Sequence, residues 1–301
     1  MNLIKLCTSF LLVLLISQAA DAAITVKDAF GRGVTLPRPA SRIVSLYAGH
    51  TENLIALGAR ESLAACSVTD DKKIAGGLPR LPLRPGVEQI AALKPDLVLV
   101  RSMQTNAQAQ LFMKLRSLGV TVLALDPPAW NDFASYLELL GRLCGREEEA
   151  KKASLRAKKL MNRRPGRADG VGVFLVAQGR TLATCESGSW AARMLALAGG
   201  RNVAAGAKPL SPGSALAPFG PERLLASDAE IDAIVLQQGA MNGTTAKEFS
   251  RDPRFESMRA VRAGRVYEVS EAEISRPSLL RLEASVDNLR KLFADERVSV
   301  K

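Results

Sequence analysis

The chain has 301 residues, a formal net charge of +11 at pH 7 and an apolar fraction of 47%. This length suits two domains of ordinary size. The basic charge alone would suit a nucleic-acid partner. However, the basic residues lack interleaved aromatic side chains and the chain begins with an export signal, so we expect no nucleic-acid partner.

The first 22 residues predict a secretory signal peptide. They have a lysine at Lys5, an apolar core from Phe10 to Ile16, and a small-residue ending at Ala20-Asp21-Ala22. The core is well short of the ~20 residues that span a bilayer. Cys7 precedes the core, so no lipid anchor is expected at the cleavage point. We expect cleavage near Ala22 and a soluble exported protein, in the periplasm or otherwise outside the cytoplasm.

The region after the signal predicts a hairpin and then a parallel α/β unit. "ITVKDAFGRGVTLP" indicates two strands that turn at Gly31 to Gly33. Short β-branched runs then alternate with helical patterns, which is typical of a parallel sheet with crossover helices. In chain order these segments are "RIVSL", "HTENLIALGA", "PDLVLV", "NAQAQLFMKLRSLG" and "VTVLALD".

A long helical region follows from Asn131 to Arg164. It contains "REEE" near its middle and "KKASLRAKKLMNRRPGR" at its end, so acids come first and bases last, as the helix dipole favours. We interpret residues 146–166 as one solvated helix that links two lobes. The expected division is a signal peptide at 1–22, an N-terminal lobe at 23–145, this linking helix, and a C-terminal lobe at 167–301.

The second half repeats the order of the first. "GVEQIAALKPDLVLV" begins at Gly86, and "GPERLLASDAEIDAIVL" begins at Gly220, each with a glutamate two residues later, Glu88 and Glu222. The same alternation of strands and helices continues to a final helix from about Ser278 to Phe293. The repeated order predicts two similar lobes, each with a parallel sheet.

Three cysteines remain after signal cleavage: Cys66, Cys144 and Cys185. An odd number allows at most one internal disulfide, and the spacing matches no disulfide framework. We expect buried thiols and leave their pairing open.

Several segments together resemble one family. "RIVSLYAGHTENLIALGA", "GVEQIAALKPDLVLV", "MLALAGGRNVAAG", "DPRFESMRAVRAGRVYEV" and "ISRPSLLRLEASVDNL" look like the substrate-binding proteins of ABC importers, in the branch that captures cobalamin, ferric siderophores or haem. The resemblance runs from about Ile24 to Phe293. It implies an α/β fold of two Rossmann-like lobes with parallel sheets, joined by a single long rigid helix, with the ligand held between them.

The resemblance also implies partners. One glutamate per lobe would meet basic residues of a membrane permease, and here these positions fall on Glu88 and Glu222. Alternatively, each glutamate serves only its own helix, because a negative charge near a helix N-terminus is stabilising. We expect a monomer that delivers a metal chelate to an ABC permease with its ATPase, and we expect no cofactor. Corrinoids and ferric siderophores are the leading ligands, unranked, and haem is third because "GLPRLPLRPG" lacks the tyrosine that haem binders often have there.

Ligands of open parallel sheets bind beyond the carboxyl ends of the strands. The residues that follow strands or begin helices are therefore candidates. His50 is the single histidine and cannot alone hold a bare metal ion, but it could be one axial ligand to a metal already in a macrocycle. Ser189 is expected to be an N-cap. The expected ligand-binding residues are Tyr47, His50, Arg101, Met103, Trp190, Gln238 and Arg276, with Asn242 beside Gln238.

An exported enzyme is the rival interpretation. The sequence contains no G-x-S-x-G elbow, P-loop, G-x-G-x-x-G or C-x-x-C motif. An enzyme that acts on the chelate could have the same fold, because fold does not determine function. This alternative stays open. We expect a binding protein and not an enzyme.

Overall fold

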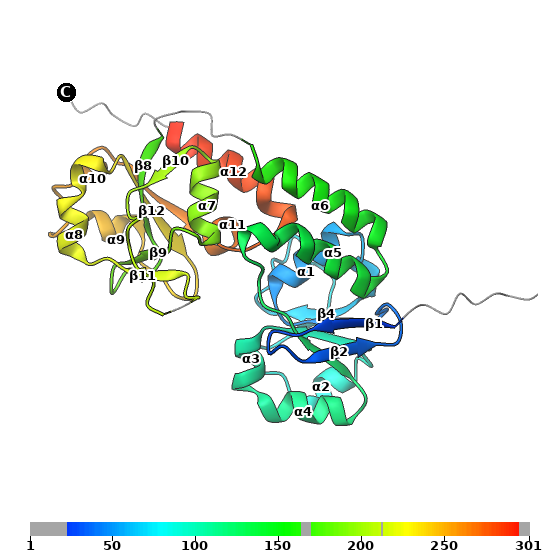
Figure 1. Cartoon of the computed structure of the whole chain (residues 1–301). Coiled ribbons are helices and arrows are strands. Elements are labelled where there is room, and N and C mark those ends of the chain that lie inside the picture. The colour runs from blue at the N-terminus through cyan, green and yellow to red at the C-terminus, as the bar shows by residue number, and fades with distance from the viewer. Residues whose placement is uncertain (1–22, 164–169, 212, 295–301) are drawn as a thin grey trace, which may run out of the picture.

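Two separate parallel sheets divide the structure into two lobes (Figure 1). The structure is a computed structural model that describes residues 23–163, 170–211 and 213–294. The expected signal peptide, and the end of the expected linking helix at 164–166, lie outside these described residues. The two α/β lobes themselves agree with the prediction from the sequence.

The N-terminal lobe is built on a five-stranded parallel sheet. In spatial order its strands are β5 (Arg80–Leu81), β4 (Leu63–Ser67), β3 (Ile43–Ser45), β6 (Leu97–Val100) and β7 (Thr121–Ala124). The chain builds outward from β3 to β5 and then returns to the other side of β3 with β6. Such a reversal is a topological switch point, where the loops after the two strands diverge and leave room for a ligand.

The C-terminal lobe is built on a four-stranded parallel sheet with the same kind of reversal. Its strands, in spatial order, are β10 (Gly200–Asn202), β8 (Val171–Val176), β12 (Ala233–Gln238) and β13 (Val266–Ser270). The chain passes from β8 to β10 and then returns to the other side of β8 with β12. The second switch point therefore lies between β8 and β12.

Two antiparallel ribbons accompany the sheets. The expected hairpin is confirmed: β1 (Ile24–Lys27) pairs with β2 (Gly33–Leu36), and Gly31 in the turn has φ 75°, which only glycine adopts readily. A second ribbon pairs β9 (Ala183–Cys185) with β11 (Leu216–Pro218) in the C-terminal lobe. No sequence pattern predicted this second ribbon.

The connection between the lobes consists of two helices, α5 (Phe133–Cys144) and α6 (Glu147–Met161), rather than one continuous helical region. Gly145, with φ 66°, ends α5 in the left-handed conformation and lets the chain turn back. The first turn of α6 is acidic and its last turn is basic, as predicted. This helix runs from the N-terminal lobe toward the C-terminal lobe (Figure 1). The limits proposed for the two lobes stay predictions.

The remaining helices pack beside the sheets. In the N-terminal lobe they are α1 (Ala48–Ala56), α2 (Val87–Ala91), α3 (Ser102–Ala107), α4 (Ala109–Ser117) and the short 3-10 turns η1 (Arg60–Ser62) and η2 (Trp130–Asp132). In the C-terminal lobe they are α7 (Trp190–Leu197), α8 (Pro221–Ala226), η3 (Asp228–Glu230), α9 (Ala246–Ser250), α10 (Arg259–Arg262), α11 (Glu271–Ile274) and α12 (Leu279–Ala294).

One helix differs from the sequence prediction. The helix expected in "NAQAQLFMKLRSLG" is broken at Gln108, whose φ of −137° and ψ of 41° separate α3 from α4. The last helix begins at Leu279, within one residue of the expected start, so Arg276 and Pro277 precede it.

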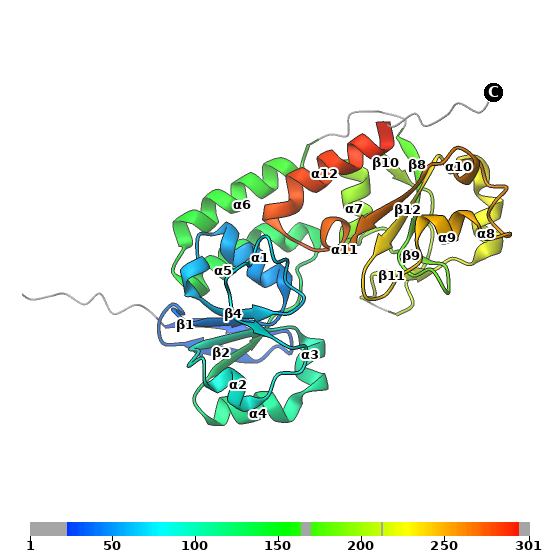
Figure 2. The same cartoon turned by 180° about the vertical axis from the view of Figure 1, so that it is seen from behind.

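One apolar core continues from the N-terminal lobe into the C-terminal lobe. Its buried members include Leu99 on β6, Phe133 on α5, Trp190 on α7 and Leu282 on α12. Figure 2 shows α12 beside α6, with its first turns close to α1 of the N-terminal lobe. The lobes therefore share packed side chains in addition to the helical connection.

Candidate ligand-binding site

Tyr47 and Arg101 meet at the switch point of the N-terminal lobe. Tyr47 follows β3 by two residues, and Arg101 directly follows β6. The guanidinium carbon of Arg101 lies 5.1 Å from the centroid of the Tyr47 ring, within the range of a cation–π contact. Both side chains are half-buried. The structure thus brings two of the expected ligand-binding residues together.

The Tyr47 hydroxyl stays protonated at neutral pH. Burial raises the pKa of Tyr47 to about 12, while the positive charges of Arg101 and Arg276 oppose this shift. Tyr47 therefore offers a neutral phenol, which can stack on a flat ligand and can donate one hydrogen bond.

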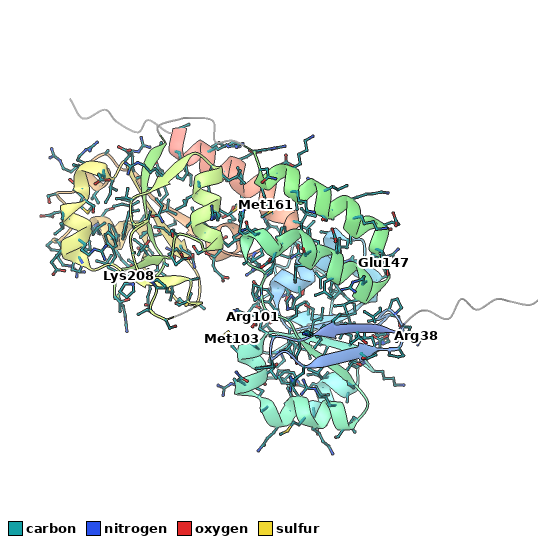
Figure 3. All side chains as sticks on the ribbon, in the orientation of Figure 1. Arg38, Arg101, Met103, Glu147, Met161 and Lys208 are labelled. Atoms are coloured by element: carbon teal, nitrogen blue, oxygen red, sulfur yellow. The ribbon has the colours of Figure 1, made fainter. Side chains whose placement is uncertain are left out.

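Exposed apolar side chains stand along the same edge of the sheet. Val68 follows β4, Leu83 follows β5, and Met103 lies two residues beyond Arg101 after β6; they are 49%, 59% and 60% exposed. Figure 3 places Arg101 and Met103 on the side of the N-terminal lobe that faces the C-terminal lobe, where Lys208 is labelled. Exposed apolar side chains gathered at one edge suit a binding surface.

The switch point of the C-terminal lobe opens onto a cavity of about 620 Å³. The loops after β8 and β12 form part of its wall, and α9 with the segment after it supplies the rest. Its lining residues are Gly179, Arg180, Ala240, Met241, Asn242, Gly243, Thr244, Glu248, Phe249, Asp252, Arg254 and Phe255. The volume lies in the range of small-molecule sites.

Gln238 and Asn242 stabilise the conformation of the loop after β12. The Gln238 amide donates to the Thr244 carbonyl at 2.8 Å, and the buried Asn242 amide donates to the Val176 carbonyl at 3.3 Å. The Asn242 side-chain oxygen accepts from the Thr244 amide at 3.1 Å. Both side chains lie at the expected edge of the sheet, and their hydrogen bonds go to the protein itself.

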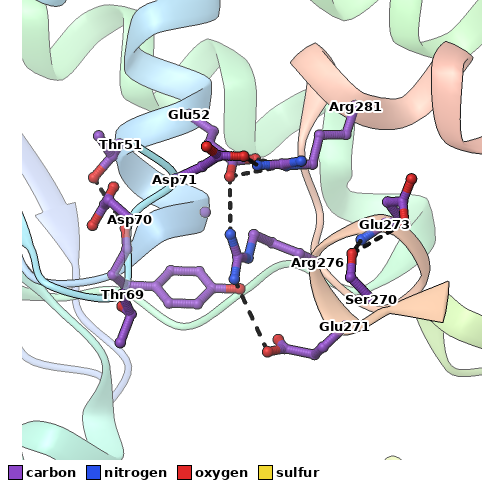
Figure 4. A network of polar contacts seen from close by, with 12 residues as sticks. Thr51, Glu52, Thr69, Asp70, Asp71, Ser270, Glu271, Glu273, Arg276 and Arg281 are labelled. Carbon is purple, nitrogen blue, oxygen red and sulfur yellow. Dashed lines mark hydrogen bonds and ion pairs between the residues drawn. The ribbon is translucent and has the colours of Figure 1, made fainter. Parts of the chain in front are cut away.

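Arg276 joins the two edges (Figure 4). Its Nη1 lies 2.9 Å from Oε1 of Glu52 on α1, and its Nη2 lies 4.0 Å from Oε2 of Glu271, which follows β13. The side chain is only 10% exposed. We call the region around Tyr47, Arg101, Glu271 and Arg276 the mouth. Glu271 also lies near the start of the loop after β12, because a Cβ added at Gly239 would lie 3.0 Å from the Glu271 Cβ.

His50 does not fit the axial-ligand role that was considered for it. The side chain is fully buried, Nε2 lies 2.8 Å from the Leu125 carbonyl, and Nδ1 lies 2.7 Å from the Tyr136 hydroxyl. A carbonyl can only accept, so Nε2 carries the proton and Nδ1 accepts from Tyr136. Burial lowers the pKa of His50 to about 4, so the ring is neutral. Both nitrogens are occupied, and His50 is a structural residue in this conformation.

Trp190 belongs to the contact between the lobes rather than to an open wall. It is 8% exposed and packs on Trp130 at 4.7 Å and on Phe133 at 5.0 Å between ring centroids. Ser189 caps its helix as predicted, because its hydroxyl accepts from the Ala192 amide at 3.2 Å. Trp130 was missed in the sequence. It is half-buried, and its position after the strand β7 could have identified it as a candidate residue of the site.

Glu88 and Glu222 occupy matching places in the two lobes. Each is exposed, and each is the second residue of a short helix, α2 or α8, that follows a glycine. The helices lie in different lobes (Figure 1). The repeated sequence pattern therefore corresponds to a repeated structural position.

Two further findings concern metals and membranes. Among residues 23–163, 170–211 and 213–294, no group of three or more His, Cys, Asp or Glu side chains is arranged to hold a metal ion. Within the same ranges, no helix combines the length and the apolar character that crossing a bilayer requires.

Comparison with known proteins agrees with this architecture. An "Uncharacterized ABC transporter substrate-binding lipoprotein YvrC" of Bacillus subtilis is 29% identical over 130 residues, which cover 42% of this chain and 41% of that protein. A "Vitamin B12-binding protein" of Yersinia pestis is 30% identical over 177 residues, which cover 56% of this chain and 62% of that protein. The matched segments thus span about two fifths and three fifths of these relatives.

A solved structure supports the fold over a longer stretch. The crystal structure of a possible iron-binding periplasmic solute-binding protein from Staphylococcus epidermidis superposes with a TM-score of 0.71 at 22% identity, covering 86% of this chain and all of that one. The family model for periplasmic binding proteins matches residues 43–272, which include both sheets and both switch points. The chain therefore belongs to the periplasmic binding protein family.

Proposed function

We propose that this chain is the substrate-binding subunit of an ABC importer, which captures a metal-chelate nutrient and delivers it to a membrane permease. One observation carries the proposal: residues that follow strands of both sheets gather at the mouth, Tyr47 and Arg101 from the N-terminal lobe and Glu271 and Arg276 from the C-terminal lobe. A cavity of about 620 Å³ lies at the switch point of the C-terminal lobe. Relatives of the chain include an ABC substrate-binding lipoprotein and a vitamin B12-binding protein.

The proposed ligand is a corrinoid or a ferric siderophore. Both carry their metal inside a chelate, so the protein has to contact only the outer surface of the ligand. The exposed Val68, Leu83 and Met103 suit apolar parts of such a surface, and Arg101 over Tyr47 suits polar groups. Haem ranks third. Ligation of haem iron by a tyrosine needs the phenolate, and the raised pKa of Tyr47 disfavours that form.

A binding role is favoured over an exported enzyme. The single histidine of the sequence is buried, and hydrogen bonds occupy both of its ring nitrogens. It is therefore not placed to act as a general base on a ligand in the mouth. The proposed protein is exported, is monomeric, uses no cofactor and returns its ligand unchanged.

Equilibrium dialysis tests the ligand class. The mature protein, residues 23–301, is dialysed in turn against vitamin B12, the ferric hydroxamate ferrichrome and haem, and bound ligand is measured by absorbance and mass. We expect one chelate to bind and to be recovered intact. Tyr47→Ala should weaken binding about fivefold or more, since one aromatic contact is worth about 1 kcal/mol or more. Met113→Ala, at an exposed position on α4, is the matched control. A changed product would favour the enzyme, and no binding of any chelate would overturn the ligand class.

Delivery to the permease is the second part of the proposal. Reversal of both exposed glutamates, Glu88→Arg with Glu222→Arg, should abolish most transport into vesicles that contain the cognate permease, because like charges would then face each other. Ligand affinity should stay unchanged, and added salt should reduce the defect. The control reverses Glu61 and Glu230, which are also exposed and lie one in each lobe, but in the 3-10 turns η1 and η3 that precede strands β4 and β12. Equal transport by both double variants would refute the docking role.

A further inference from the structure

Glu52 forms a buried ionic cluster that connects the two lobes (Figure 4). Its side chain is 1% exposed. One oxygen accepts from Nη1 of Arg276 at 2.9 Å, and both oxygens accept from Nε of Arg281, at 3.0 and 2.9 Å. Arg281 also donates through Nη2 to Asp71 at 2.8 Å. We call Glu52, Asp71, Arg276 and Arg281 the ionic joint.

The charges of the ionic joint are divided between the lobes. Both carboxylates belong to the N-terminal lobe: Glu52 lies on α1, and Asp71 lies in the loop after β4. Both guanidiniums belong to the C-terminal lobe, because Arg276 follows α11 and Arg281 lies on α12. Two negative and two positive charges balance. Loss of the two arginines would leave Glu52, which is 1% exposed, without a counter-charge, and this is costly at a buried site. Asp71 is 33% exposed and contributes less.

Neutral hydrogen bonds lie directly beside the ionic joint. The side chain of Asn53, the next residue on α1, is completely buried. Its amide donates to the Pro277 carbonyl at 2.8 Å, and its oxygen accepts from the Leu279 amide at 2.9 Å. These two bonds fasten the start of α12 to α1. Because hydrogen bonds weaken steeply with distance and angle, this contact has one preferred geometry.

Arg276 links the ionic joint to the mouth. Its Nη1 is held by Glu52, while its Nη2 points toward Glu271 at 4.0 Å, and its charge acts on the Tyr47 hydroxyl. Tyr47 immediately precedes α1, the helix that carries Glu52. A shift of α1 against α12 would therefore move Tyr47 relative to Arg276 and Glu271.

We propose that Glu52 is a positioning residue for ligand capture. By holding Arg276 and Arg281 it fixes the angle between the lobes, so that Tyr47 of the N-terminal lobe faces Arg276 and Glu271 of the C-terminal lobe before any ligand arrives. The link to capture rests on the proposed binding function, whereas the effect on the lobe angle does not. When all of the protein is in the conformation that binds ligand, no binding free energy is spent on converting an open conformation, and the apparent affinity is not reduced.

The lobe angle can be measured on the ligand-free protein. Burial raises the pKa of Cys66 to about 11 and the pKa values of Cys144 and Cys185 to about 12, so introduced cysteines react selectively with a nitroxide label. The labelled positions are Met113→Cys on α4 and Leu225→Cys on α8, which are 59% and 40% exposed. Double electron–electron resonance then gives the distribution of distances between the lobes.

Glu52→Gln should widen this distribution about twofold or shift it, since the ligand-free protein gains a second populated lobe angle. The matched control is Glu283→Gln. Glu283 on α12 also contacts two arginines, Arg156 and Arg163, at 3.0 and 3.1 Å, but its side chain is 39% exposed. The control should keep the parental distribution, because exposed ion pairs are weak. An unchanged distribution in Glu52→Gln would overturn the proposal.

Arg281→Lys provides a second variant if Glu52→Gln does not fold. It keeps the charge but loses the planar fork that bridges Glu52 and Asp71, so it should also widen the distribution. In dialysis against vitamin B12, ferrichrome and haem, Glu52→Gln should bind the parental ligand about tenfold more weakly, since only about a tenth of the protein would be competent. A wider distribution with unchanged affinity would overturn the positioning role. Absence of binding by the parent would count against the proposed function alone.

Discussion

The lobes meet through two contacts of opposite chemistry. One is aromatic: Trp190 of the C-terminal lobe packs on Trp130 and Phe133, with ring centroids about 5 Å apart. The other is the ionic joint, in which Glu52 holds Arg276 and Arg281. Apolar packing is nearly indifferent to direction, whereas charged hydrogen bonds require particular distances and angles. We therefore expect the aromatic contact to contribute cohesion and the ionic joint to set the geometry.

The two contacts also differ in how their partners are spaced along the chain. Trp130 and Phe133 lie within about 60 residues of Trp190, on either side of the linking helix. Glu52 and Arg276 are separated by 224 residues, which span most of both lobes. The ionic joint consequently forms only when both lobes are folded and correctly placed. Its formation therefore indicates that the native arrangement of the lobes is complete.

The largest expected effect is on the aromatic contact. Trp190→Ala should lower the free energy of unfolding by about 3–5 kcal/mol, because a buried ring is lost and a cavity remains between the lobes. Chemical denaturation followed by circular dichroism measures the change. Leu155→Ala, at a 67% exposed position on α6, should change it by less than about 0.5 kcal/mol. Similar costs for the two variants would show that the aromatic contact contributes little.

Acid should weaken the N-terminal lobe close to the ionic joint. His50 lies on α1, two residues before Glu52, and burial lowers its pKa from 6.5 to about 4; Arg101 acts in the same direction, while the Leu125 carbonyl and Asp126 oppose it. The neutral ring favours the folded state above pH 6.5, and this contribution is lost as the pH falls from 6.5 to 4. The expected loss is about 3 kcal/mol from this group.

The variant His50→Gln isolates that effect. It removes the titrating group while keeping one donor and one acceptor, so the fall in unfolding free energy between pH 6.5 and 4 should be about 3 kcal/mol smaller than in the parent. Denaturation curves at several pH values measure both slopes. Identical pH profiles would mean that His50 is not buried in its neutral form.

The smallest expected effect separates the neutral bonds from the charges of the joint. Asn53→Ala should cost about 1–3 kcal/mol, because it leaves the Pro277 carbonyl and the Leu279 amide without their buried partner. Asn288→Ala, which removes an exposed amide bonded to Glu273 at 3.2 Å, is the control and should cost less than about 0.5 kcal/mol. A cost for Asn53→Ala as small as that of the control would leave the ionic pairs as the only source of fixed geometry.

The strands, and the edge of each sheet at which residues follow their carboxyl ends, could be predicted because they depend on local patterns. Runs such as "DLVLV" and "DAIVLQ" are apolar and β-branched, and their alternation with helices implies parallel sheets. The matching positions of Glu88 and Glu222 followed from a repeated phrase. Tyr47 and Arg101 were found by their place after strands, which is a rule of topology and needs no knowledge of side-chain contacts.

The incorrect or missed features depend on contacts between distant segments. His50 has the sequence position of a ligand-facing residue, but Tyr136 and Leu125 turn it into an interior group. Glu52 sits in the helical run "HTENLIALGA" and has no local sign of burial, because its partners lie more than 220 residues away. Trp190 could be placed on a helix, but only the position of Trp130 decides which way the ring faces.

The two tryptophans give the protein an intrinsic fluorescence probe of the contact between the lobes. The sequence contains two tryptophans, and both lie at the aromatic contact, with ring centroids 4.7 Å apart. All indole emission of the protein therefore originates from a single point between the lobes. A shift in its wavelength or lifetime reports a change of packing at that point, without any label and without background from the rest of the fold.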